Sequence, residues 1–185
     1  MSETYDPNSQ IYDPKTKKRT FVRAVEGDYG LNAELKRLRS MPRVLKGKER
    51  KFDQGPQEFN KHYMHPADGI GQTLHIHMKE YSPGGVSHKH GHANEACFYI
   101  LDGEGFEIHD EVRYDWKAGD LAIVPSNCVH QHNNGSKKNP VRALVLKTKP
   151  TYLFMNLLFQ KTVIPTPKVP SPEGIGYVPR EEGDK

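Results

Sequence analysis

Cysteine is scarce in this sequence, and long apolar runs are absent. The only cysteines are Cys97 and Cys128, without a CxxC pair, which excludes a disulfide framework. We expect both to be buried free thiols in a reducing compartment. No run approaches the ~18 apolar residues of a membrane helix, and the first ten residues contain no apolar signal segment. The sequence therefore predicts a cytoplasmic protein with no membrane partner.

Apolar residues are also few, at 35% of the chain, and they concentrate between positions 73 and 159. This distribution predicts one domain, at 70–160. An N-terminal arm (1–69) would pack on it, and a proline-rich tail (161–185) would follow. Within the arm, Leu31, Leu35 and Leu38 share one helical face, which predicts a short helix ending before Pro42. The residues from 44 to 65 are mostly polar and are expected to be irregular.

The net charge of +4 does not indicate a nucleic-acid partner. Basic residues cluster at 15–23 and 36–51, but acidic residues are interleaved with them. No platform of aromatic and basic side chains accompanies these clusters. We interpret them as solvated surface.

The central region consists of short apolar segments separated by Gly, Pro and Asp, with no helical pattern between them. This pattern predicts an all-β sandwich or barrel. The expected strands are 73–81, 96–101, 105–109, 121–125, 141–147 and 152–159. The expected core residues are Phe98, Ile100, Leu121, Ile123, Leu144 and Leu146.

Histidines are spaced two residues apart in this region. Side chains at i and i+2 on a strand point to the same side, so His90 and His92 can face one point inside a barrel. His130, beyond the turn at 125–127, is placed to add a third imidazole. Neutral imidazoles bind Fe, Zn, Cu and Ni. We interpret the other strand histidines as tolerated polar residues; these are His62, His65, His75, His77 and His109.

Two motifs resemble those of the cupin superfamily. In the first, Gly84 and five further residues precede His90-x-His92, and Gly103 follows. In the second, Gly119 and five residues precede Pro125, and His130 and Asn134 follow, with Asn127 at a turn position where the family usually has Gly. The resemblance covers about 70–159. It implies a single double-stranded β-helix, the jelly-roll cupin barrel.

The glutamate that many cupins use as a fourth ligand is out of register here. Its expected position holds Ala96, and Glu95 lies one residue earlier. In one register, His90, His92 and His130 bind the metal. In the other, His88, His90, Glu95 and His130 bind it, with a bulge before Gly103. The glycine spacings favour the first, and His88 and Glu95 remain candidate ligands.

An all-histidine site and the second motif resemble the gentisate dioxygenase branch of cupins, which implies Fe(II) and a hydroxylated aromatic acid. Zn, Mn or Ni are the other metals considered. We therefore expect an enzyme, a non-haem iron dioxygenase (an oxidoreductase), with a small-molecule substrate and with His132 and Glu95 as candidate acid–base groups. The alternatives are a non-oxidative isomerase, lyase or decarboxylase, and a binding cupin without catalysis. The family resemblance also implies a homodimer.

Overall fold

The computed structural model describes residues 32–53, 55–71 and 73–181. Residues 1–31 and 54 of the predicted arm at 1–69 lie outside these residues. The chain divides into two compact units, Met1–Val44 and Leu45–Lys185. In the first unit, helix α1 spans Asn32–Ser40, which confirms the expected short helix. Its Glu34 and Arg37 side chains pair one turn apart, at 2.6 Å.

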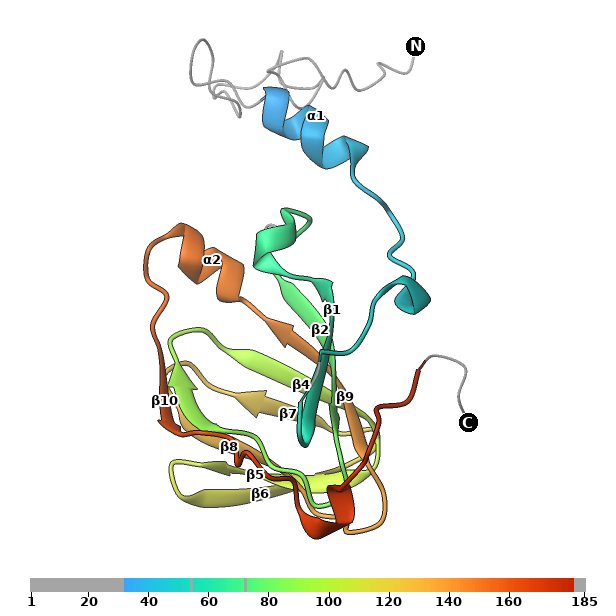
Figure 1. The fold of residues 1–185 in the computed structure, drawn as a ribbon. Helices are drawn as coiled ribbons and strands as arrows, with labels where there is room; N and C mark the ends of the chain where they lie inside the picture. Colours follow the sequence, from blue (N-terminus) through green and yellow to red (C-terminus); the bar gives the residue numbers. More distant parts are fainter. Residues whose placement is uncertain (1–31, 54, 72, 182–185) are drawn as a thin grey trace. The chain divides into compact units, whose positions relative to one another are not determined.

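The described part of the second unit contains two antiparallel sheets of five strands each (Figure 1). The first has the order β1-β2-β9-β4-β7, and the second has the order β10-β3-β8-β5-β6. This is a jelly-roll β-barrel, as the sequence predicted. The first sheet comprises β1 (Glu58–Met64), β2 (His75–Tyr81), β9 (Val141–Lys147), β4 (Ala96–Asp102) and β7 (Leu121–Val124). The second comprises β10 (Gln160–Ile164), β3 (Lys89–His92), β8 (Val129–Asn134), β5 (Glu104–His109) and β6 (Val112–Lys117).

The helices of this unit are short. Helix α2 spans Lys149–Phe154, and three 3₁₀ turns lie at Gly47–Glu49, Pro66–Asp68 and Pro172–Gly174. None of the helices in the described ranges is long and apolar enough to cross a membrane. Cys97 and Cys128 are both free; Cys128 is buried and Cys97 is half-buried.

The core lies between the inner faces of the two sheets. Phe98 and Ile100 are buried there, as predicted. The prediction for Leu121 and Ile123 was wrong, because they are 54% and 57% exposed. Phe98 is paired with Ala122 across the strands, and paired side chains point to the same side of the sheet. The even-numbered residues of β7 therefore face the core. All four residues of β7 are apolar, so alternation of polarity could not reveal its phase. The predicted core residues Leu144 and Leu146 likewise alternate with the buried Val141, Ala143 and Val145 and are only half-buried.

The turn residues of both motifs adopt the left-handed backbone that their positions require. Gly84, Gly103 and Gly119 have φ values of 65°, 86° and 95°. Asn127 has φ 64°, and asparagine tolerates this region better than most residues with a side chain. Its backbone N–H donates to the His92 carbonyl at 2.9 Å. The turn of the second motif is thereby fixed against the histidine strand of the first.

Three segments differ from the sequence-based expectation. Residues 58–64, expected to be irregular, form β1, whose Phe59 packs on Tyr177 of the tail with ring centroids 5.9 Å apart. The expected strand at 152–159 is wrong, because Lys149–Phe154 is helical, and Pro150 in its first turn favours a helix start. Residues 160–164, at the predicted start of the tail, form β10, which pairs with β3.

The tail after β10 runs along the outside of the first sheet. Its Pro167 carbonyl accepts a hydrogen bond from Gln57 Nε2 at 3.0 Å, and Ser171 Oγ donates to the Pro83 carbonyl at 2.6 Å. Further along, the buried carboxylate of Glu80 accepts from the backbone N–H of Arg180 at 2.9 Å. Residues 165–181 of the tail are therefore a packed part of this unit.

Candidate metal centre

Three buried histidines meet on the inner face of the second sheet. His90 and His92 lie on β3, and His130 is paired with His90 across the strands on β8. Their exposed fractions are 3%, 2% and 0%. The ligand atoms of the three all lie within 4.8 Å of one another. Gly91 separates the two β3 histidines, and a Cβ there would lie 3.3 Å from the Cys128 carbonyl oxygen, so the strands approach closely at this point.

The hydrogen bonds of these rings fix which nitrogen faces the shared space. Nδ1 of His90 contacts the His88 carbonyl at 3.2 Å, Nδ1 of His92 contacts the Asn94 carbonyl at 2.6 Å, and Nδ1 of His130 contacts the Cys128 carbonyl at 3.1 Å. A carbonyl only accepts, so each Nδ1 must carry the proton and each Nε2 keeps a lone pair. Nε2 of His92 and of His130 are buried without a hydrogen-bond partner.

The protonation state also suits a cation. Burial lowers the pKa of His92 to about 4 and that of His130 to about 2, and it lowers the pKa of His90 as well. All three imidazoles are therefore neutral near pH 7, which is the form that binds a metal. Three converging lone pairs, two of them on orphaned buried atoms, fit a divalent metal ion. The backbone carbonyls that hold the Nδ1 protons are the outer partners that orient such ligands.

A second layer of ionisable groups lies beside this centre. His132 follows His130 by two residues on β8, and its Nδ1 contacts Glu107 Oε1 at 2.7 Å. The other Glu107 oxygen contacts His109 Nε2 at 2.6 Å. Burial acts to raise the pKa of Glu107, but His132 and His109 outweigh it and hold this pKa at about 2. The sequence analysis missed Glu107. Its spacing from His109, which puts both on one face of β5, is the signal that could have found it.

Comparison with known proteins identifies the family to which this part of the chain belongs. Residues 77–147 match the family model described as "Cupin domain". This part of the chain is a cupin domain. No curated protein matched the sequence.

Solved structures share the cupin fold with this chain at low sequence identity. One is salicylate 1,2-dioxygenase from Pseudaminobacter salicylatoxidans, with TM-score 0.53 and 15% identity over 58% of this chain and 31% of that chain. Its gentisate adduct gives TM-score 0.54 and 14% identity, over 71% of this chain and 36% of that one. Another is the polyketide cyclase RemF from Streptomyces resistomycificus, with TM-score 0.51 and 19% identity, over 58% of this chain and 79% of that chain. The chain thus spans about a third of the dioxygenase chains, and the likeness concerns the fold.

The cupin domain does not bring every predicted site residue into the cluster. Glu95 is exposed, just before β4, while its neighbour Ala96 faces the interior with 1% exposure. His88 lies at the edge of the site: its ring stacks on His90 at 3.9 Å, its side chain is 27% exposed, and its Nδ1 is 3.8 Å from a Glu58 oxygen. Neither belongs to the group of three that could hold a metal ion.

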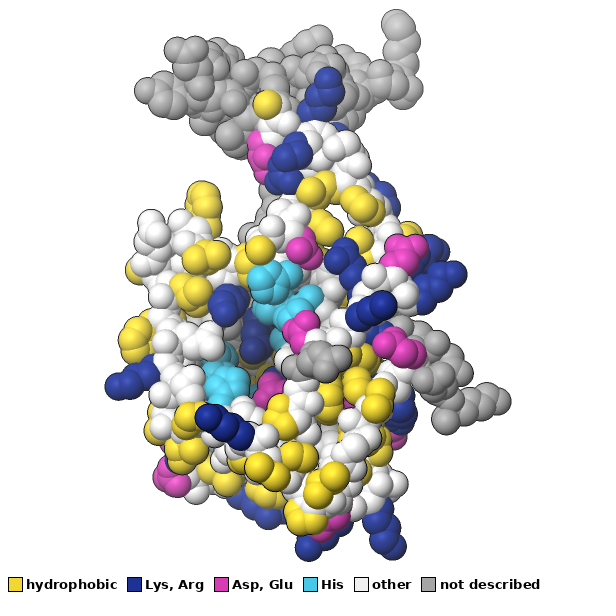
Figure 2. Space-filling view, in the orientation of Figure 1, with side chains coloured by type: hydrophobic (Ala, Val, Ile, Leu, Met, Phe, Trp, Pro, Cys, Tyr) yellow, Lys and Arg dark blue, Asp and Glu magenta, His cyan; other side chains and the backbone are white. Residues whose placement is uncertain are grey.

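The amine of the half-buried Lys147 is a further group near the cupin centre that the sequence analysis missed. Lys147, the last residue of β9, is paired with His75 and with Ala96, and so faces the barrel interior. Its charge acts to lower the pKa of all three cluster histidines. Burial lowers the pKa of Lys147 itself to about 7. Figure 2 shows lysine or arginine side chains between two groups of histidines on one face of the molecule.

Proposed function

We propose that this cupin is a metal-dependent enzyme, a non-haem Fe(II) dioxygenase that acts on an aromatic or other chelating hydroxylated substrate. The observation that carries the proposal is the convergence of three neutral histidines, His90, His92 and His130, without a carboxylate among them. Three ligands leave positions open on a six-coordinate ion. Iron bound there would act as a Lewis acid toward a chelating oxygen and would pass electron density from the substrate to O₂.

Residues around the centre have roles that follow from their contacts. Glu107 accepts the Nδ1 proton of His132, which leaves Nε2 of His132 as the proton acceptor. We assign acid–base work to this atom, oriented by Glu107. The Lys147 amine, with its pKa near 7, binds an anionic group of the substrate when protonated. Phe98, whose ring lies 4.1 Å from that of His132, helps to exclude water.

The comparisons support this reaction class only through the fold. The salicylate dioxygenase structures include adducts with gentisate, a small hydroxylated aromatic acid. By analogy, a small molecule of this kind is the proposed substrate class. Exposed Glu95 has no part in the proposed mechanism, although it was a candidate ligand and acid–base group. A cytoplasmic location also remains part of the proposal, from the sequence alone.

The test combines iron content with oxygen uptake in protein prepared without chelators. We expect bound iron, and O₂ consumption when gentisate, salicylate or a catechol is added. His130→Ala should lower both the iron content and the rate at least tenfold, because it removes one of three ligands. The matched control is Glu95→Gln, which should change neither. Full iron occupancy in His130→Ala, with unchanged folding by circular dichroism, would refute the site.

A non-oxidative cupin enzyme that uses Zn, Mn or Ni is the second candidate function. The observation in its favour is size, because this chain covers 79% of the polyketide cyclase chain but only 31% of the dioxygenase. Such an isomerase, lyase or decarboxylase would turn over without O₂. Activity that persists in an anaerobic assay therefore selects this candidate. Metal and ligand binding without turnover in either assay would indicate a cupin that only binds small molecules.

We also propose that the cupin domain forms a homodimer. Apolar side chains lie exposed on the outer face of the first sheet, at Tyr99, Leu121 and Ile123, and a second copy would cover them. Light scattering coupled to size exclusion should give twice the 21.1 kDa chain mass. Leu121→Glu should lower that mass, and a monomeric wild-type protein would exclude the dimer.

A further inference from the structure

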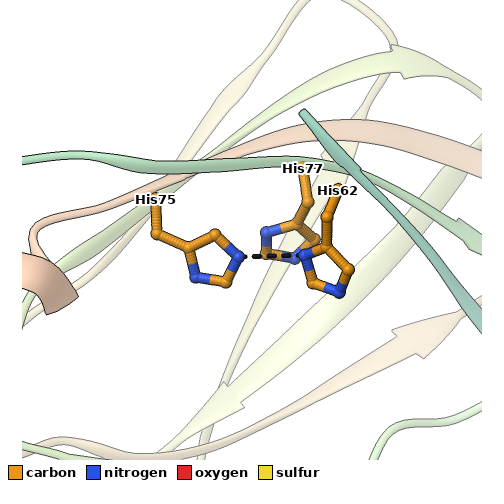
Figure 3. A group of neighbouring side chains, drawn as sticks. All are labelled: His62, His75 and His77. Carbon is orange, nitrogen blue, oxygen red and sulfur yellow. Dashed lines mark hydrogen bonds between the residues drawn. The ribbon is translucent and has the colours of Figure 1, made fainter. Parts of the chain in front are cut away.

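A second group of three histidines lies on the other sheet of the barrel. His75 and His77 are two residues apart on β2, and His62 on β1 is paired with His77 across the strands. The three side chains therefore project from the same face of the first sheet. Figure 3 shows their rings pointing toward one another. The ligand atoms of the group lie within 4.8 Å of one another, and the group shares no residue with His90, His92 and His130.

Two nitrogens of this group are buried without a partner. His75 is 6% exposed and His77 is 3% exposed, and the Nδ1 atom of each has no hydrogen-bond partner. Burying an imidazole nitrogen away from water without a hydrogen-bond partner costs free energy. The sequence-based interpretation of these histidines as tolerated polar residues therefore does not explain the cluster. An ion bound at the nitrogens that face one another, among them Nε2 of His75, would offset part of this cost.

Asp53 supplies an orienting contact for His62, the half-buried member of the group. Its Oδ2 lies 3.4 Å from Nε2 of His62. Nδ1 of His62 is thereby directed inward, 3.0 Å from Nε2 of His75. A carboxylate behind a histidine is a common second partner of a metal ligand, because it fixes the tautomer and the ring orientation.

The ring geometry is close to what an ion needs. Zn–N bonds of about 2.0–2.1 Å in a tetrahedral site place ligand nitrogens roughly 3.3 Å apart. The His62–His75 contact would open by a few tenths of an ångström from its 3.0 Å. The ring centroids of His75 and His77 are 4.8 Å apart, and those of His62 and His77 are 5.2 Å apart. Small rotations of the side chains would therefore complete the set.

Neighbouring charges set the protonation state of the cluster. Burial is the main cause that lowers the pKa of all three histidines, and it brings the pKa of His75 to about 3. The positive charge of Lys147 lowers the pKa of His75 and of His77 further. The rings are therefore neutral near pH 7. The pKa of Lys147 is itself lowered by burial to about 7, so this amine is partly uncharged at neutral pH and opposes a cation less than an ordinary lysine would.

We propose that His62, His75 and His77 form a second transition-metal site, selective for zinc-like ions and independent of the cupin centre. Three imidazoles with one open position suit Zn²⁺, and Co²⁺ can replace it as a coloured probe. The ion would tie the edge strand β1 to β2. This proposal does not rest on the proposed dioxygenase function, since the two sites share no ligand.

The His90→Ala variant isolates the second site. After dialysis against Zn²⁺, wild-type protein should hold two equivalents per chain and His90→Ala should hold one. Adding His62→Gln to His90→Ala should remove the remaining equivalent, or weaken its binding at least tenfold. The matched control is His65→Gln, because His65 lies beside the group, with its ring 5.0 Å from that of His62, but is not a member. It should leave the stoichiometry unchanged.

Two measurements on the unmutated protein keep the test independent of folding defects. Anomalous scattering at the zinc edge from a zinc-soaked crystal should give peaks at both histidine groups. Titration with Co²⁺ should give strong tetrahedral absorption bands whose full intensity corresponds to one equivalent per chain, at the second site, because the cupin centre is proposed to be six-coordinate. A single anomalous peak at His90, His92 and His130, or no loss of zinc in the double variant, would overturn the second site. Wild-type protein that binds zinc at His62, His75 and His77 but shows no dioxygenase activity would instead overturn the proposed function and leave the second site standing.

Discussion

At the scale of single residues, the Glu107 carboxylate holds two histidines beside the candidate metal centre. This carboxylate is 1% exposed and contacts both His132 and His109. In Glu107→Gln, the amide keeps one of these bonds as an acceptor but loses the negative charge that raises the pKa of His132. We expect the free energy of unfolding to fall by about 1–3 kcal/mol, because a buried charged hydrogen bond is lost.

Urea unfolding measures this loss, and nitrogen chemical shifts of the imidazole should show a changed His132 tautomer. The matched control, Glu104→Gln, lies on the same strand but is exposed, so it should stay within about 0.5 kcal/mol of the wild type. A Glu107→Gln protein as stable as this control would contradict the assigned role.

Residue spacing predicted which histidines would meet, but not what lies around them. His90 and His92 could be selected because each motif glycine fixes a turn, and turns fix strand register. Local spacing links Glu107 to His109 and His75 to His77, but Glu107 meets His132, and His62 meets His77, only through pairing between different strands. His62 and His77 are adjacent because β1 pairs with β2, and β1 itself was expected to be irregular. Such contacts leave no local pattern in the sequence.

At the scale of elements, local patterns predicted the strands of the barrel and failed at its margins. Segments with turn residues on both sides, such as Val141–Lys147, were predicted with their bounds. The polar strand β1 has buried Phe59 and Lys61 on its outer face only because the tail covers it. The apolar run after residue 150 was predicted to be a strand. Its polarity does not alternate, and the proline at its start favours a helix, so the segment forms α2.

The tail should depend on one buried carboxylate of β2. Glu80 is fully buried, accepts from Arg142 Nε at 2.5 Å and from the Arg180 backbone N–H at 2.9 Å, and also contacts the Tyr177 hydroxyl. Glu80→Gln should cost about 1.5–3 kcal/mol of stability. It should also speed hydrogen exchange at 165–181, as measured by mass spectrometry. Asp102→Asn removes only the exposed partner of Arg180 and should cost under about 1 kcal/mol. Equal exchange in both variants would show that Glu80 does not hold the tail.

At the scale of the whole molecule, the barrel is an enclosure for neutral histidines. Two groups on facing sheets contain six imidazoles, and burial lowers the pKa of every one of them. The amino-acid composition does not predict these lowered pKa values, because it counts buried and exposed histidines alike. The arrangement makes the stability of the metal-free protein a function of pH.

The metal-free protein should lose stability as the pH falls below about 6.5, the value for an exposed histidine. In the unfolded chain each histidine binds a proton as the pH falls through about 6.5. In the folded chain His92 stays neutral until about pH 4, and His75 stays neutral until about pH 3. The unfolded state therefore holds more protons, and stability rises with pH across this window. Each such group contributes about 1.4 kcal/mol per pH unit. Several together exceed the usual 5–15 kcal/mol stability of a domain within about two to three units.

Urea midpoints of chelator-treated protein, taken between pH 7.5 and 4.5, measure this dependence. This pH range avoids the contributions of Glu58 and Glu107. Their lowered pKa values change the stability only below about pH 4.5. We expect a steep fall from pH 6.5 downward, and a slope smaller by about one proton in His92→Gln, because the pKa difference of one histidine is gone. A midpoint that stays constant from pH 7 to 5 would mean that these histidines are solvated in the folded protein. In that case neither histidine group would be a preformed metal site.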